Sequence, residues 1–196
     1  MEPRYLNISI PHDWHWSDQE LYEFCQVNRD LRIERDASGK IIIMAPSGGN
    51  TSHHNADLII DLGTWNRKYQ LGKVFDSNGG FILPSGAMRA PDAAFVLQER
   101  WDALTEAEKE GFPPLCPDFV VELRSPSDRL PVLQEKMVEW IENGCRMAWL
   151  IDPAEEQAFI YYADGQTESI TTFDQPLPGG NVLPGFELDL SQLKNS

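Results

Sequence analysis

Residues 119–151 carry the pattern that most restricts how this chain can fold. A short apolar run at residues 119–124 is followed by an amphipathic helix and then by a second apolar run at residues 147–151. The helix is indicated by apolar residues spaced three and four apart, and it ends near Asn143-Gly144. Two strands joined by one helix lie parallel in a sheet. The segment therefore predicts an α/β protein.

The sequence on either side of this unit predicts hairpins and two more helices. The S-x-x-E sequence at residues 17–20 is a capping box that starts a short helix ending near Asn28. A hairpin is expected from strands at 31–35 and 41–44, and a longer helix runs from about Ser52 to Gln70. Near the C-terminus, residues 159–162 and 168–172 predict another hairpin, and residues 186–190 a last short strand. We expect an α/β fold with a mixed sheet flanked by helices, in a single domain spanning residues 1–196.

Other local signals place the remaining strands and one helix cap. Strands are expected at residues 74–75 and 81–83, around Asn78-Gly79-Gly80, and at residues 91–96 with a proline at the first position. A polar loop with one helical turn spans residues 98–117. Residues 125–128 consist of N-capping residue types and a proline, and are expected to cap the helix that follows.

Charge restricts what the chain can bind. The 31 acidic and 16 basic residues give a net charge of −15, whereas proteins that grip a long phosphate backbone are usually basic. Only Lys194 among the basic residues lies beyond Arg146, so a nucleic-acid surface is expected in the first three quarters of the chain.

Cysteine spacing and hydropathy bear on location. Cys25, Cys116 and Cys145 have no paired spacing and are expected to be buried thiols. No basic segment with an apolar run opens the chain, and no stretch approaches the roughly 20 apolar residues that span a bilayer. We therefore expect a cytoplasmic protein that does not bind membranes.

Two acidic residues interrupt apolar strands. Asp92 stands at the start of the strand at residues 91–96, and Glu122 lies within the strand at residues 119–124. An acid gains nothing from burial unless it is paired or binds a cation. Two such carboxylates on neighbouring strands would suit Mg²⁺ or Mn²⁺, which lowers the pKa of a bound water and neutralises charge on a phosphate. The pattern favours hydrolysis of a phosphodiester, with Asp92 and Glu122 as metal ligands.

Three more residues are candidates for this site. Arg124 should share a strand face with Glu122, and Lys136 lies about 60° around its helix from the apolar stripe, so either cation could face an attacking water or a phosphate. The alternatives are an exposed or paired strand face for Arg124 and a solvated helix surface for Lys136. Glu34, whose side chain should point to the other face of its strand from Ile33, is either an outer ligand or a solvated residue. The four histidines show no metal-site spacing, so no zinc site is expected.

These motifs together resemble the Uma-type restriction endonuclease-like family, which belongs to the PD-(D/E)XK nuclease superfamily. The matching segments are residues 33–34, 39–46, 89–96, 117–128, 136–144 and 149–153, and the resemblance covers nearly the whole chain. It implies a restriction-endonuclease-like fold, with Asp92 and Glu122 as metal ligands, Lys136 as the superfamily lysine moved from strand to helix, and Glu34 as an auxiliary acid. The third place of the E-x-K triplet is Arg124, which departs from the family pattern.

Three functions are consistent with the sequence. The first is a Mg²⁺-dependent (or Mn²⁺-dependent) endonuclease that hydrolyses DNA, contacts only a short stretch of it, and cuts both strands as a homodimer. The second is a weakly catalytic module with the nuclease fold, which binds or regulates protein partners through its acidic surface. The third is a two-carboxylate hydrolase of sugars, which requires a wider separation of the carboxyl groups than one metal ion allows.

Overall fold

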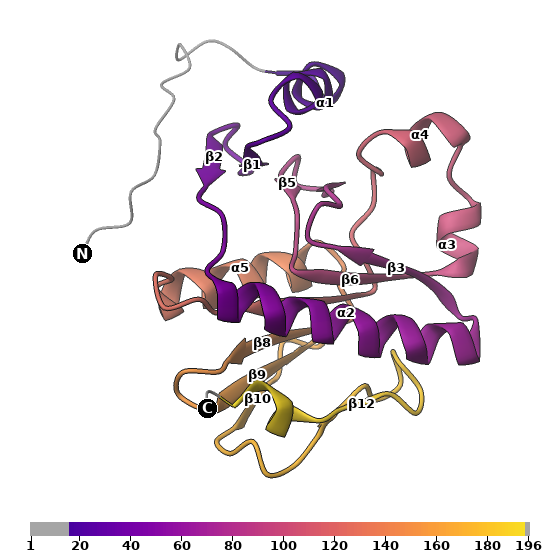
Figure 1. Ribbon diagram of the computed structural model, residues 1–196. Helices are drawn as coiled ribbons and strands as arrows, with labels where there is room; N and C mark the ends of the chain where they lie inside the picture. Colours follow the sequence, from indigo (N-terminus) through magenta and orange to yellow (C-terminus); the bar gives the residue numbers. More distant parts are fainter. Residues whose placement is uncertain (1–15, 195–196) are drawn as a thin grey trace.

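The computed structural model describes residues 16–194, which form helices, a large sheet and two smaller sheets (Figure 1). The helices are α1 (Asp18–Val27), α2 (Gly49–Tyr69), α3 (Gln98–Asp102), α4 (Glu106–Glu110), α5 (Leu130–Glu142) and the 3-10 helix η1 (Leu190–Leu193). The first six strands are β1 (Arg32–Arg35), β2 (Ile41–Met44), β3 (Gly72–Asp76), β4 (Phe81–Ile82), β5 (Met88–Arg89) and β6 (Ala93–Leu97). The others are β7 (Phe119–Leu123), β8 (Met147–Asp152), β9 (Gln157–Tyr162), β10 (Thr167–Ile170), β11 (Leu177–Pro178) and β12 (Glu187–Leu188).

The large sheet has the strand order β10-β9-β8-β7-β6-β3 and is mixed. Strands β7 and β8 are parallel, with Phe119 opposite Met147 and Leu123 opposite Ile151, and α5 connects them. The neighbouring pairs β6–β7, β3–β6, β8–β9 and β9–β10 are antiparallel. The strand-helix-strand unit and the mixed α/β sheet predicted from the sequence are therefore confirmed.

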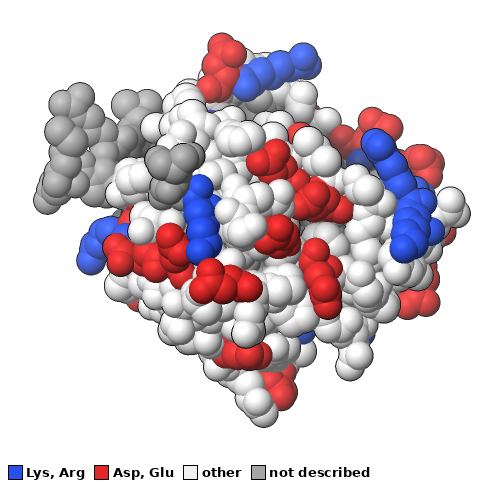
Figure 2. Space-filling model, turned by 60° about the horizontal axis from the view of Figure 1, so that its bottom comes forward, with Lys and Arg blue, Asp and Glu red and all other residues white. Residues whose placement is uncertain are grey.

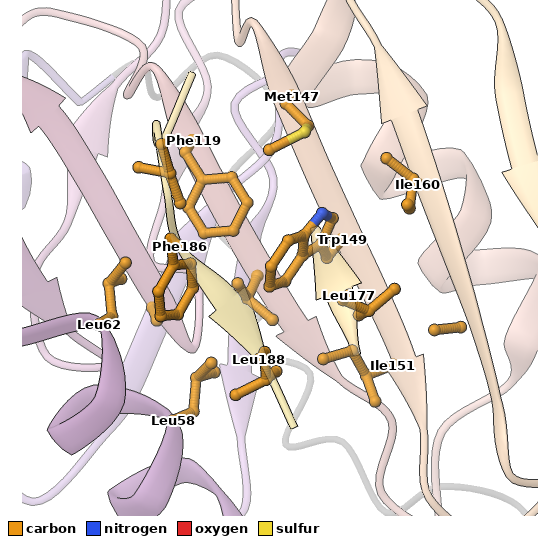
Figure 3. Close-up of a cluster of buried hydrophobic side chains, with 14 of the residues drawn as sticks. Leu58, Leu62, Phe119, Met147, Trp149, Ile151, Ile160, Leu177, Phe186 and Leu188 are labelled. Atoms are coloured by element: carbon orange, nitrogen blue, oxygen red, sulfur yellow. The ribbon is translucent and has the colours of Figure 1, made fainter. Parts of the chain in front are cut away.

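One face of this sheet packs against α2. Alternate side chains of β7 and β8, including Phe119 and Trp149, point to this face and meet Leu58 and Leu62 of the helix (Figure 3). Trp149 lies edge-on to Phe119 at 4.8 Å and stacks on Phe186 at 5.9 Å between ring centroids. Burying a leucine or phenylalanine of this kind stabilises a fold by about 1.5–3 kcal/mol. The C-terminal hairpin of β11 and β12 closes this core on one side.

The opposite face of the sheet packs against α5. Val120, Ala148 and Leu150 point to this side and pack with Met137 and Trp140 of the helix. Glu122 belongs to the same alternation as Val120, so its carboxylate is directed toward α5 although its neighbours are apolar. Strand β7, whose apolar side chains are part of this core, therefore also positions the carboxylate of Glu122 on the same face.

A second sheet with the order β2-β1-β5-β4 packs against α1. The capping box that starts α1 is present: the Ser17 side chain accepts from the Glu20 amide, and the Ser17 amide donates to the Glu20 carboxylate. The hairpin of β1 and β2 is also present, with Ile33 opposite Ile43. Residues 90–92 connect β5 in this sheet to β6 in the large sheet, so Asp92 lies at the junction of the two sheets.

The strands expected on either side of Asn78-Gly79-Gly80 are present, but they enter different sheets, since β3 pairs with β6 and β4 with β5. Other local expectations are wrong. Helix α2 begins at Gly49, three residues before the predicted start. Residues 125–128 do not cap α5, whose N-cap is Arg129 without a side-chain bond; instead, the Asp128 carboxylate accepts from the Ser125 amide at 2.9 Å. Cys25 is half-buried, whereas Cys116 and Cys145 are buried as expected.

No helix among residues 16–194 has both the length and the apolar composition required to cross a bilayer.

Candidate active site

Asp92 and Glu122 lie on adjacent antiparallel strands. Asp92 directly precedes β6, Glu122 is in β7, and the neighbouring register pairs Ala93 with Val121. Both acids are buried, with 8% and 4% of their surface exposed. The Asp92 Oδ2 atom accepts a hydrogen bond from the Leu123 amide at 2.8 Å, which fixes this carboxylate against the end of β7.

Lys136 of α5 lies between two carboxylates. Its Nζ atom is 2.8 Å from Oε1 of Glu122 and 2.9 Å from Oε1 of Glu34. Its side chain is 13% exposed, so the solvated alternative for this lysine is wrong. One helical turn later, Trp140 donates its indole N–H to Oε1 of Glu122 at 3.2 Å. Helix α5 thus supplies two donors to the same carboxylate oxygen.

Glu34 enters the site from β1 and is 2% exposed, so its solvated alternative is also wrong. Its Oε1 atom accepts from the Ala90 amide at 3.1 Å as well as from Lys136. Its Oε2 atom lies 3.0 Å from Nη1 of Arg89. Arg89 also forms a two-pronged pair with Glu139 of α5, at 2.7 and 3.1 Å. Arg89 therefore links the small sheet to the helix that carries Lys136.

Arg32 is the second residue that β1 contributes. Its Nη2 atom lies 3.1 Å from Oδ1 of Asp92 and 3.4 Å from the carbonyl oxygen of Ala90. Residues 32 and 34 share one face of the strand, while Ile33 points into the apolar core beneath α1. Strand β1 therefore delivers one cation and one anion to the same site.

The pKa values of these groups show how charge is balanced. Burial raises the pKa of Glu122 to about 7; Lys136 acts against this, and the charges of Asp92 and Glu34 act with it. Burial also acts to raise the pKa of Glu34, but Lys136 and Arg89 outweigh it and hold that pKa below its ordinary value. For Lys136, burial alone would lower the pKa, yet the two glutamates raise it above its ordinary value. The neighbouring cations therefore compensate the charge of Glu34 but not that of Glu122.

A count of formal charges in this cluster points the same way. The cluster has four carboxylates and three cations, namely Glu34, Asp92, Glu122 and Glu139 against Arg32, Arg89 and Lys136. The excess negative charge and the hard oxygen donors fit a divalent cation. Within residues 16–194, no three His, Cys, Asp or Glu side chains are grouped closely enough to hold a metal ion by themselves. A divalent cation held here would therefore take its remaining ligands from water or phosphate oxygens.

Arg124 lies apart from this cluster. Its Nη1 atom pairs with Oδ2 of Asp152 at the end of β8, and its Nε atom donates to the carbonyl oxygen of Asp128 at 3.3 Å. Asp152 is fully buried and also accepts from the Gln157 side chain at 3.2 Å. Arg124 is therefore an ion-paired residue, as in the alternative interpretation of the sequence, and it connects the loop after β7 to the neighbouring strand β8.

Four residues of this cluster are not among the candidates predicted from the sequence: Arg32, Arg89, Glu139 and Trp140. One signal was available for Trp140, because it follows Lys136 by four positions and therefore lies on the same side of the helix. The arginines gave no comparable signal, since their partners lie 50 to 60 positions away. Of the histidines, His54 is buried on α2, and His12 and His15 lie outside the described residues.

Comparison with known proteins agrees with the fold. A solved structure described as "a putative nuclease belonging to DUF820", from Anabaena variabilis ATCC 29413, superimposes with a TM-score of 0.70 and 21% sequence identity, over 82% of this chain and 88% of the other. No curated protein sequence matches the chain. The sequence model of the Uma2 family, whose description is "Putative restriction endonuclease", matches residues 18–191. The match spans most of the chain, and the protein therefore belongs to the Uma2 family.

Proposed function

We propose that this chain is a Mg²⁺- or Mn²⁺-dependent endonuclease that hydrolyses phosphodiester bonds of DNA, acting as one nuclease-like domain. The family supports a nuclease-like function. The observation that carries the proposal is the buried cluster in which Lys136 lies between Glu34 and Glu122, with Asp92 just before the adjacent strand β6, and in which carboxylates outnumber cations. Buried acids of this kind are retained where they bind a cation or take part in chemistry.

Asp92 and Glu122 are the proposed metal ligands. Oε1 of Glu122 is contacted by the Lys136 ammonium and by the Trp140 indole N–H, which leaves Oε2 as the oxygen available for a cation. A bound divalent cation supplies a water of lowered pKa and neutralises charge on the phosphate. Glu34 is the auxiliary acid in this proposal. Lys136 and Arg89 already engage its charge, so its role is to hold Lys136 in place.

Lys136 is proposed to act as a charged donor. The two glutamates raise its pKa, which keeps the amine protonated at neutral pH. A protonated amine can orient a water or stabilise charge on a phosphate, but it cannot accept a proton. Arg124 is a positioning residue in this proposal, because its ion pair with Asp152 holds the loop that follows Glu122.

The distribution of charge limits how DNA can approach. Eight acidic residues follow Ile151, whereas Lys194 is the sole basic residue of that segment. Figure 2 shows acidic side chains across the middle of one face, with Lys and Arg toward its margins. We expect DNA to reach the cluster from the side of β1 and α5, over a short stretch, and a homodimer to present two such sites to the two strands. The three free cysteines are consistent with a cytoplasmic location.

Cleavage of supercoiled plasmid and of single-stranded DNA, with Mg²⁺ or Mn²⁺, tests the proposal. The wild type should nick the plasmid, and Asp92→Asn and Glu122→Gln should each lose the activity. The matched control is Asp118→Asn, since Asp118 is 1% exposed but lies at the other end of β7, where it pairs with Arg100. Circular dichroism checks that each variant is folded. Equal cleavage by all four proteins, or none by the wild type, would contradict the proposal.

The acidic surface favours a second candidate, a weakly catalytic module that binds protein partners. The net charge of −15 opposes a long DNA contact and suits a basic protein surface. In that case the wild type should cut no DNA with either metal ion. Substitutions of exposed acids after Ile151 should then weaken partner binding, while Asp92→Asn leaves it unchanged.

A further inference from the structure

Arg32 has an incomplete set of hydrogen bonds. A guanidinium has five N–H donors, and the contacts of Arg32 with Asp92 and the Ala90 carbonyl both use Nη2. Its Nε atom is buried and has no partner among residues 16–194. Buried donors are nearly always paired, so an unpaired one at a candidate active site calls for an explanation.

Neighbouring arginines do not share this feature. Arg89 uses Nε, Nη1 and Nη2 on two carboxylates, and Arg35 uses the same three atoms on Gly86, Trp16 and Asp18. Among the described residues, the Nε of Arg32 is the only buried arginine nitrogen without a partner. The other two arginines are held on several sides, whereas Arg32 retains donors for another acceptor.

Arg32 can also be reached from outside. Its side chain is 27% exposed, compared with 11% for Arg89 and 13% for Lys136. A guanidinium presents parallel N–H groups that match two oxygens of a phosphate. Arg32 is thus a partly exposed cation with unused N–H donors beside an acidic cluster, where a phosphodiester would otherwise be repelled.

The Asp92 contact bears on metal binding as well. Arg32 Nη2 lies 3.1 Å from Oδ1 of Asp92, and Leu123 donates to Oδ2, so both oxygens of this proposed ligand are engaged. A cation placed on Asp92 would compete with the guanidinium for Oδ1. Release from Asp92 would leave Arg32 with most of its donors free.

We propose that Arg32 is a phosphate-binding residue that competes with a divalent cation for Asp92. It pairs with this carboxylate until the cation replaces it, and it then donates hydrogen bonds to a phosphate of the bound nucleic acid. This inference rests on the proposed function of the site. It predicts opposite effects of removing the arginine. Metal binding should become tighter because a competitor is lost, whereas DNA binding should become weaker because a phosphate contact is lost.

Two binding experiments test this, with wild type, Arg32→Met and Arg32→Lys. The control is Arg29→Met, because Arg29 is exposed and, within the described residues, donates only to the Gln26 carbonyl. Calorimetric titration with Mn²⁺ and no DNA should give a lower Kd for Arg32→Met than for wild type. Binding of a labelled DNA duplex with Ca²⁺, at several salt concentrations, should show the slope of log K against log salt reduced by about 1 for Arg32→Met. Arg32→Lys should keep the wild-type salt slope but bind DNA less tightly, since it keeps the charge but loses the parallel N–H groups of the guanidinium.

The outcomes separate this inference from the proposed function. If Arg32→Met binds Mn²⁺ no more tightly than wild type, or keeps the wild-type DNA salt slope, the inference is overturned even when the wild type cuts DNA. If the wild type cuts no DNA but both binding effects are seen, the endonuclease proposal fails and the inference stands. Parallel changes in Arg29→Met would also overturn it, because they would reflect general charge alone.

Discussion

The ammonium of Lys136 lies 2.9 Å from the carboxylate of Glu34, a contact that joins α5 to β1 across 102 positions of the chain. The same nitrogen lies 2.8 Å from Glu122 in the large sheet. One side chain therefore connects the helix to both sheets. Its removal would leave two buried carboxylates without their main partner, which is far more costly than breaking an exposed pair.

Lys136→Met should lower the free energy of unfolding by about 3–5 kcal/mol at pH 8. At pH 5.5 the loss should be smaller, because Glu122 has a pKa of about 7 and is protonated there. Urea unfolding at the two pH values measures the difference. Lys73→Met, which changes an exposed lysine on β3, should cost no more than about 0.5 kcal/mol. A loss that is the same at both pH values would show that charge is not its cause.

Glu122→Gln should alter how stability depends on pH. In the wild type the folded protein keeps a proton on Glu122 up to about pH 7, whereas the unfolded chain releases it near 4.5. Between these values the folded state binds more protons, so this group makes stability fall as pH rises, by at most about 1.4 kcal/mol per pH unit. The amide of the substituted side chain cannot ionise. The variant should therefore gain stability relative to wild type as pH increases from 5 to 8.

The measurement is the difference in unfolding free energy between the two proteins at each pH, since other groups titrate in both. The control is Glu187→Gln, because Glu187 is exposed on β12. A constant difference between Glu122→Gln and wild type from pH 5 to 8 would mean that Glu122 is ionised throughout.

Two fully buried tryptophans give a matched test of the hydrogen bond to Glu122. Trp140 donates to that carboxylate, whereas the indole nitrogen of Trp149 has no partner in the described part of the chain. Both changes to phenylalanine remove similar apolar surface. Trp140→Phe should cost about 1–3 kcal/mol more than Trp149→Phe, since only the first removes a hydrogen bond to a buried carboxylate, which then keeps Lys136 alone. Urea unfolding above pH 7 measures this, and equal costs would contradict it.

Much of the fold follows from local sequence patterns. Helix α5 and strands β7 and β8 have clear periods, and one helix between two strands requires a parallel pair. The partners of β3 and β4 were beyond local reasoning. Residues 78–80 are of turn-forming types, but the strands beside them enter different sheets. A side chain at Gly80 would meet the Phe112 ring at 2.9 Å, so the path of this turn depends on a contact distant in sequence.

The candidate site was predictable to a similar extent. Asp92 and Glu122 stood out because an acid in an apolar strand requires a partner, and Lys136 because its helix position allowed it to lean inward. Arg124 was expected beside Glu122 on one strand face, but it lies one residue beyond β7 and its partner is Asp152 at the end of the neighbouring strand β8. Arg89 lies on a two-residue strand whose partners come from distant elements, so no local period identifies it.

Arg89 and Glu139 should be strongly coupled. Their two-pronged pair is 11% and 21% exposed, and Arg89 also reaches Glu34. A double-mutant cycle with Arg89→Met and Glu139→Gln should give a coupling energy of about 1–3 kcal/mol in unfolding free energy. In the Glu139→Gln variant, Glu34 still pairs with Lys136. That single change should therefore lower the unfolding free energy less than Arg89→Met does.

The control cycle uses Lys109 and Glu106, a pair within α4 whose glutamate is 86% exposed. Its coupling should not exceed about 0.5 kcal/mol, since water screens the charges and the side chains are mobile. Equal coupling in the two cycles would mean that the Arg89 pair is effectively solvated. Strong coupling for Arg89 alone would mean that the small sheet is held to α5 by charge, and that β1 is kept in place to present Glu34 and Arg32 to the site.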